Sequence, residues 1–262
     1  MRRKFQVILL ILVVVILAAC GDDTDKKEET NQTSQLGPLE WDRGASTILL
    51  RMDSRPKEAA PQELDTRIPP CTLWGDGRLV WLNELESEKQ VLEARLNDEK
   101  IRELLEKVIF SGFYEWQSDY IIPNSANPYI ESITLNLYNE ERTVSRYSGW
   151  PVDAYAQILK TCQEISDTPV LFAPEGGWLT AYEVPRVEGI GYWRWAKDEA
   201  GFSLAEVTNN NPRWITGDLA KAVWNTTIET GSRLGVLEDN IAYELVLRVP
   251  GVSRDSPPEP TE

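Results

Sequence analysis

The sequence predicts an α+β protein, in which antiparallel sheets built from hairpins carry about three amphipathic helices. Short apolar runs separated by turn residues recur along the chain, and three longer stretches carry apolar residues at helical spacing. The helices fall between groups of strands instead of alternating with single strands, which is typical of α+β folds. Residues 46–252 are expected to form one globular domain, with two subdomains divided near residues 168–176 as the alternative.

The first predicted strands form a meander. Residues 47–52 and 90–96 favour strands, and the apolar runs 71–74 and 78–82 flank a Gly-Asp-Gly turn centred on Asp76. Asp-Gly between two apolar runs is the strongest short hairpin signal, because a type I′ turn needs positive φ at both central positions. Asp76 is therefore interpreted as a turn residue and not as a catalytic acid.

Two helices are expected around a second hairpin. Asn97 can cap the first helix, whose apolar residues recur up to Ile109, and Gly112 ends it. The hairpin that follows pairs two strands through a turn, and the second helix starts near a proline, which is favoured in a first helical turn. The strands are 130–138 and 142–147, the turn is 139–141, and the second helix has residues 152, 155, 158, 159, 162 and 165 on its apolar face.

The second half of the chain predicts strands, a helix and a final hairpin. Thr216 is expected to cap the helix, which contains three apolar residues on one face. In the last strand Tyr243, Leu245, Leu247 and Val249 alternate onto one side, as in a half-buried strand. The expected strands are 178–184, 191–195, 202–207, 233–237 and 241–249, and the helix is 217–227.

The N-terminus has the order of an export signal. Arg2, Arg3 and Lys4 precede an apolar run, residues 7–19, which Cys20 closes. Positive residues stay in the cytoplasm while the apolar stretch enters the translocon. A permanent membrane span needs about 20 apolar residues, so this run favours a signal peptide.

Residues 17–20, Leu-Ala-Ala-Cys, resemble the lipobox that ends the type II signal peptide of bacterial lipoproteins. The resemblance implies that residues 1–19 are removed and that Cys20 carries a diacylglyceryl thioether with fatty acids such as palmitate. Two or three acyl chains would hold the protein on the extracytoplasmic face of the cell membrane or the outer membrane. An ordinary secretory signal cut near Ala19 and a short uncleaved anchor remain as alternatives.

Both ends of the exported chain favour disorder. Residues 21–35 contain acidic and polar residues and no aliphatic one, so they bury too little apolar surface to offset the entropy of ordering. We interpret residues 20–45 as a lipidated cysteine followed by a disordered acidic tether. The proline-rich end, residues 253–262, is expected to be a disordered tail.

Composition excludes several kinds of chemistry. The 262 residues include 27 Lys and Arg, 42 Asp and Glu and no His, which gives a formal net charge of −15. A chain this acidic repels phosphate backbones, so we expect no nucleic-acid partner. Without His there is no Ser-His-Asp or Cys-His nucleophile and no His-ligated zinc or iron site. We therefore expect no metal and no other cofactor.

Two cysteines and a tryptophan cluster are the remaining candidate features. Outside the cytoplasm Cys71 and Cys162 could form a disulfide or remain two buried thiols, and spacing alone does not decide between them. The ten tryptophans are densest at residues 192–195, where Trp193 and Trp195 would share one face of a strand. These tryptophans could either pack in the core or form an exposed binding surface, and the sequence does not decide between the two. The candidate surface consists of Tyr192, Trp193, Arg194 and Trp195.

Residues 69–78, with the helix and hairpin that follow, resemble bacterial lipoproteins whose activity is not established. That resemblance implies a location and a fold but no reaction. We therefore expect a lipid-anchored binding or assembly module at the cell envelope, with an envelope protein or glycan as its partner. The alternative is a carboxylate-dependent hydrolase of envelope glycans, which would need two facing carboxylates in a deep cleft.

Overall fold

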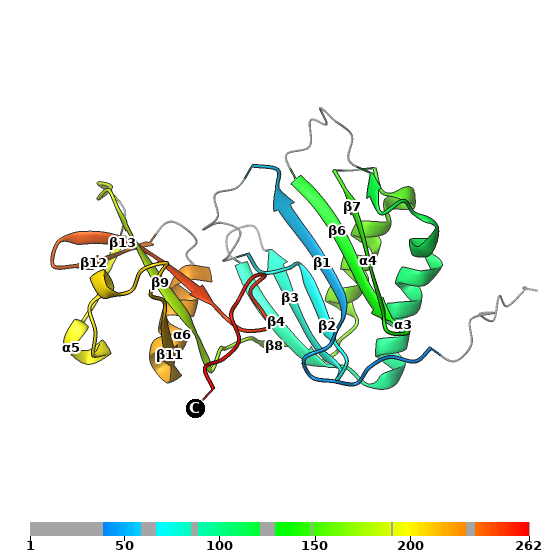
Figure 1. Ribbon diagram of the computed structural model, residues 1–262, viewed down its shortest axis with the longest axis horizontal. Coiled ribbons are helices and arrows are strands. Elements are labelled where there is room, and N and C mark those ends of the chain that lie inside the picture. Colours follow the sequence, from blue (N-terminus) through cyan, green and yellow to red (C-terminus); the bar gives the residue numbers. More distant parts are fainter. Residues whose placement is uncertain are drawn as a thin grey trace, which may run out of the picture. The chain divides into compact units, whose positions relative to one another are not determined.

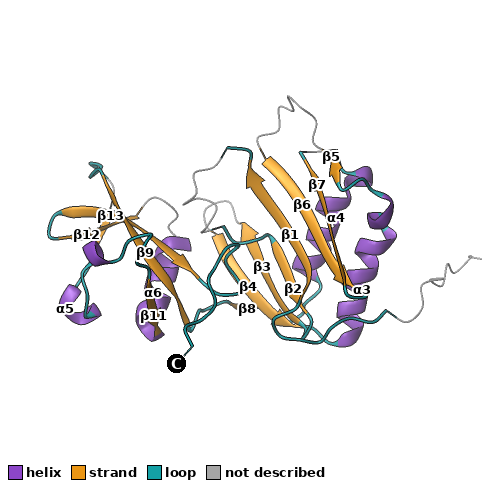
Figure 2. Cartoon of the chain, viewed as in Figure 1, coloured by secondary structure: helices purple, strands orange, loops and turns teal. Residues whose placement is uncertain are grey.

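The two sheets and their helices confirm the predicted α+β class (Figures 1 and 2). The computed structural model describes residues 39–58, 67–84, 89–120, 129–147, 149–189, 191–228 and 234–261. The predicted signal peptide, Cys20 and most of the predicted tether therefore lie outside the described residues. Within those ranges, no helix is long and apolar enough to cross a membrane. Residues 40–262 belong to a single compact unit.

The first sheet has eight strands in the order β5-β7-β6-β1-β2-β3-β4-β8. Its neighbours are antiparallel except for β5 and β7, which run parallel. The predicted meander and second hairpin make up its centre. The strands are β1 (Ile48–Pro56), β2 (Cys71–Trp74), β3 (Arg78–Glu84), β4 (Lys89–Arg95), β5 (Asp119–Tyr120), β6 (Tyr129–Leu137), β7 (Glu140–Arg146) and β8 (Val170–Leu171).

Helices α3 (Asp98–Phe110) and α4 (Ala154–Glu164) cover one face of this sheet (Figure 1). As predicted, the Asn97 side chain accepts a 2.9 Å hydrogen bond from the Lys100 backbone at the start of α3. Gly112, with φ of 91°, follows the helix and starts a short 3-10 turn (η1, Phe113–Glu115). This left-handed conformation suits glycine because it has no Cβ.

The second sheet has five strands in the order β10-β12-β13-β9-β11. The chain passes from one sheet to the other between β8 and β9, inside the 168–176 range expected for a division. Helix α6 (Gly217–Ile228) packs against this sheet, and α5 (Lys197–Ala200) is a single short turn. The strands are β9 (Gly176–Val184), β10 (Gly191–Arg194), β11 (Arg213–Thr216), β12 (Leu234–Glu238) and β13 (Ile241–Arg248).

Strand register explains how the core is divided. Met52 of β1 pairs with Ile133 of β6 and with Cys71 of β2, so these side chains share the face that α3 and α4 cover. Residues of the opposite face, including Trp74 and Val80, belong to a hydrophobic cluster that also contains residues of the second sheet and α6. The eight-stranded sheet is thus buried on both faces at β2, β3 and β4, whereas Thr134 of β6 and Thr143 of β7 hydrogen-bond to each other at the surface of its outer face.

Several expectations for individual elements are wrong. Residues 202–207 do not form a strand, because the Ser203 hydroxyl accepts a hydrogen bond from the Ala205 N–H and starts a 3-10 turn (η3, Leu204–Glu206). Val152 is not on the buried face of α4 but is 76% exposed, in the distorted turn η2 (Pro151–Asp153) before the helix. The β6–β7 turn is shorter than expected and uses positive φ at Tyr138 and Asn139. The short elements β5, β8, β11 and α5 were not predicted.

The ordered body is longer at both ends than the sequence predicts. The Trp41 indole donates to the Gly75 carbonyl at 3.2 Å, so part of the predicted tether packs on the β2–β3 turn. At the other end Ser253 is 2% exposed, and Arg254 Nε lies 3.1 Å from Asp53 Oδ2. The expectation of a disordered tail is therefore wrong for these residues, because a buried carboxylate on β1 supplies a partner for a charge in the tail.

Candidate functional site

A large cavity, with a volume of about 870 Å³, lies at one end of the eight-stranded sheet. It opens where β1 and β3 end and where β4 and β6 begin, and α4 forms another part of its wall. Ligand pockets in proteins typically have volumes of about 300–1,000 Å³. The size therefore suits a small organic ligand.

The strands bring polar groups to the inner wall of this cavity. Ser54 and Glu131 are direct cross-strand partners on β1 and β6. By the alternation of β6, Glu131 shares its face with Ile133 and Leu135, which are buried. This face of the sheet is therefore apolar in its middle, and at the cavity it carries the hydroxyl group of Ser54 and the carboxyl group of Glu131. Asn83 adds an amide from the end of β3.

Helix α4 contributes a stripe of three lining residues, Tyr155, Leu159 and Gln163. Their spacing of four residues places them on one side of the helix. The Tyr155 hydroxyl donates a 3.0 Å hydrogen bond to the Asp53 carbonyl, and Gln163 Nε2 donates a 3.1 Å bond to the Leu82 carbonyl. These two bonds hold α4 to the ends of β1 and β3, so the wall of the cavity is fixed on both sides.

A disulfide between Cys71 and Cys162 crosses beside the cavity. Their Cα atoms are 6.5 Å apart, and both residues are fully buried. The residue before Cys71, Pro70, and the residue after Cys162, Gln163, both line the cavity. The covalent bond thus joins α4 to β2 directly behind the lining residues. It decides, in this structure, between the two alternatives that the sequence left open.

Glu131 is the polar group with the most unusual surroundings. Its Oε2 accepts a 2.7 Å hydrogen bond from Trp150 Nε1. Burial raises the pKa of Glu131 above its ordinary value, and the bond from Trp150 opposes only part of that shift. Burial, together with the negative charges of Glu131 and Asp53, also raises the pKa of Tyr155, so its hydroxyl stays protonated at neutral pH.

The charged groups of the lining balance each other. Lys89 Nζ lies 3.0 Å from Glu84 Oε1, and both side chains are more than half exposed. Arg67 donates to the Ser54 carbonyl and places its guanidinium over the Tyr129 ring, 5.7 Å from the centroid. With Glu131, the lining carries two acids and two bases. We therefore expect a ligand without a large net charge.

This arrangement can form hydrogen bonds, but it lacks a demonstrated catalytic pair. Glu131 is half-buried, whereas Glu84, the other carboxylate among the described lining residues, is exposed and bound to Lys89. In the described part of the chain, no group of three or more His, Cys, Asp or Glu side chains is placed to hold a metal ion. The cavity offers hydroxyl, amide and carboxyl groups beside apolar side chains such as Ile68 and Leu159.

The four residues of the predicted aromatic surface do not form one surface. Trp193 and Trp195 share a face, with ring centroids 5.6 Å apart, but Trp195 is 6% exposed and donates from Nε1 to the Phe202 carbonyl. Tyr192 bonds the backbone of Val187 and does not line the adjoining pocket. That pocket, of about 300 Å³, is lined by Trp193, Arg194, Trp195 and four neighbours. Its role in binding stays a prediction.

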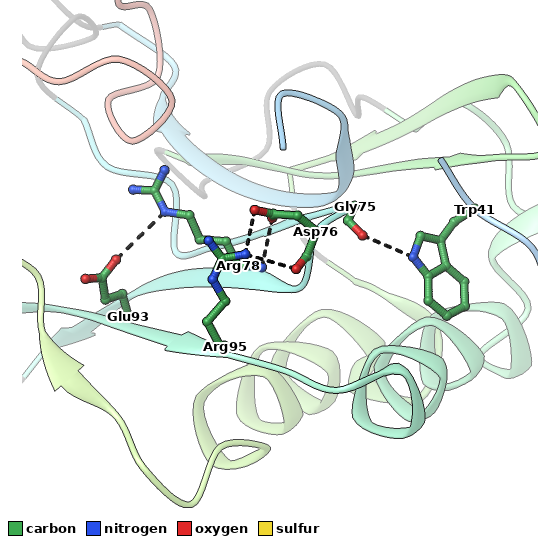
Figure 3. A network of polar contacts seen from close by, with 6 residues as sticks. All are labelled: Trp41, Gly75, Asp76, Arg78, Glu93 and Arg95. Carbon is green, nitrogen blue, oxygen red and sulfur yellow. Dashed lines mark hydrogen bonds and ion pairs between the residues drawn. The ribbon is translucent and has the colours of Figure 1, made fainter. Parts of the chain in front are cut away.

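Asp76 lies in a turn, as predicted, but the expected type I′ geometry is wrong, because of residues 75–77 only Gly77 has a positive φ. Its carboxylate accepts hydrogen bonds from the Arg78 backbone at 3.1 Å and from Arg95 at 2.6 Å (Figure 3). Partial burial alone would raise the pKa of Asp76, but these hydrogen bonds hold it below its ordinary value. Arg78 in turn approaches Glu93 at 3.8 Å. This network pins the β2–β3 turn to β4.

No protein-family model, curated protein or solved structure matches the chain. A functional assignment therefore depends on the chemistry of the site itself. Sequence reasoning missed Glu131, Tyr155 and Arg67, which are far apart along the chain. One signal was present: Glu131 occupies a position of β6 at which the alternation places apolar residues.

Proposed function

We propose that this protein is a lipid-anchored, extracytoplasmic binding module of the cell envelope, and that the 870 Å³ cavity is its ligand-binding site. The lipid anchor is inferred from the resemblance of residues 17–20 to a lipobox, with Cys20 as the lipidated residue. The observation that carries the binding role is the convergence of Ser54, Glu131 and the α4 stripe on one cavity.

The chemistry of the lining favours a polar, uncharged ligand with an apolar face, such as an envelope saccharide. Hydroxyl and amide groups of the wall match the donors and acceptors of such a ligand. Leu159 and Ile68 supply apolar contact, and Tyr129, 43% exposed, presents an aromatic ring. The balanced charges of the lining give no strong preference for either sign of ligand charge.

Glu131 is the specific observation that favours the alternative, a carboxylate-dependent glycan hydrolase. A carboxyl group whose pKa is raised by burial holds its proton to higher pH than an exposed one, which is what a general acid requires. A hydrolase would also need a second carboxylate at about 5 Å or 6.5–9.5 Å from the first. Turnover separates the two functions: a hydrolase would cleave an envelope glycan as wild type and lose that activity in Glu131→Gln, whereas a binding protein would cleave none in either form.

The direct test is recovery of the ligand from the protein's own envelope. Tagged wild-type protein, extracted in detergent, would be compared with Leu159→Trp, which fills the cavity from α4. Lys160→Trp is the matched control, since Lys160 is the next residue on α4 and its side chain is 71% exposed. We expect wild type and Lys160→Trp to recover the same ligand and Leu159→Trp to lose it. Equal recovery by all three proteins would contradict the assignment of the cavity.

A further inference from the structure

A pair of tryptophans lies on the five-stranded sheet, outside the cavity. Trp178 of β9 and Trp214 of β11 are direct cross-strand partners, and their rings meet edge to face with centroids 5.4 Å apart. Both residues are half-buried, and neither belongs to the hydrophobic core cluster. Their neighbours Leu179 and Ile215 point to the other face of the sheet and are buried in that cluster. The pair therefore forms an aromatic platform on the outer face, here called the Trp178–Trp214 platform.

The local sequence makes room for this platform. Gly176 lies against the Trp214 ring, and a Cβ atom at residue 176 would come within 2.6 Å of Trp214 Cζ2. Arg248 of β13 is the cross-strand partner of Trp178 on its other side. Cross-strand partners share a face, so the platform has a basic residue beside its indole rings.

The chain's own proline-rich tail contacts the platform at Trp178. Trp178 Nε1 donates a 2.9 Å hydrogen bond to the Pro258 carbonyl. Residues 256–260 read Ser-Pro-Pro-Glu-Pro, so Pro257 and Pro260 have the spacing of a PxxP segment. Consecutive prolines favour the extended polyproline II helix, whose carbonyls are not used by internal hydrogen bonds. An aromatic surface that also offers an N–H donor is the group that proteins use to bind such segments.

The contacts of the tail divide it into an anchor and a lightly held end. Arg254 forms the anchor, because its Nε lies 3.1 Å from Asp53 and its backbone N–H donates to the Arg67 carbonyl at 2.9 Å. Residues 258–261 are exposed, and the Trp178–Pro258 bond is at the surface. Since the tail is already fixed at Arg254, residues 256–260 can leave the platform without release of the anchor.

We propose that the Trp178–Trp214 platform is a binding site for a proline-rich segment of a partner protein, and that residues 256–260 occupy it in cis as a competitor. The partner segment carries PxxP spacing and an acidic residue, as Glu259 does in the tail. The acidic residue suits the position of Arg248 beside Trp178. The partner binds by displacing the tail, so the length and composition of the tail set its apparent affinity.

The test uses a synthetic peptide with the sequence of residues 256–262, labelled with a fluorescent dye at its N-terminus and titrated with the detergent-extracted protein, so that fluorescence anisotropy measures binding to every variant. We expect the peptide to bind a variant that ends at Asp255 at least about 5-fold more tightly than it binds the full chain. Full-length Pro257→Ala, Pro258→Ala is a second variant with a weakened competitor, and it is expected to bind the peptide more tightly than wild type.

Trp178→Phe keeps the ring and removes the donor, so in either weakened-tail protein it should reduce peptide binding at least about 10-fold. Trp193→Phe, on the same sheet, is the matched control and should leave binding unchanged. A peptide with its three prolines replaced by alanine should not bind. No binding to either weakened-tail protein, equal binding of the alanine peptide, or full binding after Trp178→Phe would overturn the proposal. Equal affinity for the full chain and both tail variants would overturn the competition by the tail.

Discussion

The indole nitrogen of Trp150 donates a 2.7 Å hydrogen bond to Glu131 Oε2 at the wall of the large cavity. The bond joins the residue before η2 and α4 to strand β6, which is 19 residues earlier in the chain. It favours the charged form of Glu131, whereas burial favours the neutral form and outweighs it.

Glu131 should make stability depend on pH. Its pKa is raised in the folded protein, so the folded state holds the proton more tightly than the unfolded chain. We expect wild type to lose stability relative to Glu131→Gln as pH rises from about 4 through the raised pKa. Urea unfolding of both proteins between pH 4 and pH 8 measures this difference. A difference that stays constant over the range would show that the environment of Glu131 is not as described.

The disulfide should contribute a large part of the stability. It links residues that are 91 positions apart, and closing a loop of that size is worth about 4.6 kcal/mol in the entropy model. Cys71→Ala, Cys162→Ala should therefore lower the free energy of unfolding by about that amount. Reductant should destabilise wild type and leave the double variant unchanged. Equal unfolding of wild type with and without reductant would mean that the bond is absent.

Gly77 and Gly149 offer a matched pair for testing the β2–β3 turn. Both have positive φ, but a Cβ at Gly77 would lie 2.4 Å from the Leu96 carbonyl, whereas a Cβ at Gly149 would meet nothing within 4 Å. Gly149→Ala should cost about 1–2 kcal/mol for the left-handed backbone alone. Gly77→Ala should cost about 1–3 kcal/mol more, because the turn must move away from Leu96. Equal losses in thermal unfolding would argue against the close approach.

The ion pair between Arg254 and Asp53 can be tested by a double-mutant cycle. Arg254→Met leaves the Asp53 carboxylate, 9% exposed, without this partner, and should cost about 3 kcal/mol. Adding Asp53→Asn should restore much of that loss, since the buried charge is then gone. Asp255→Asn, in the next residue and 65% exposed, is the control and should have little effect. Additive losses in the double variant would rule out the coupling.

Local signals predicted much of the fold. The Asn97 cap and the apolar spacing up to Ile109 located α3, and the alternation from Tyr243 to Leu247 located β13. These features depend on residues within one turn or one strand, so they can be predicted from the local sequence alone. The prediction was wrong where two local signals competed. The apolar residues of segment 202–207 favour a strand, but the Ser203 side chain caps the 3-10 turn η3 instead.

The candidate site could not be predicted, because its parts meet only through long-range pairing. Ser54 and Glu131 are neighbours through the β1–β6 register, and Tyr155 reaches them because the disulfide and the hydrogen bonds of Tyr155 and Gln163 hold α4 against the sheet. The prediction that residues 253–262 are disordered was wrong at Ser253 and Arg254 for a similar reason. The composition of this segment favours disorder, but Asp53, about 200 positions earlier in the sequence, supplies a buried partner for Arg254.

Intact-mass analysis of the native protein's N-terminus shows whether a lipid holds the folded body outside the cytoplasm. We predict a chain that starts at Cys20, lacks residues 1–19 and carries the mass of a diacylglyceryl group with two or three fatty acids. A native protein recovered from the cytosol with residues 1–19 still attached, or one that starts at residue 20 without fatty acid, would contradict the account.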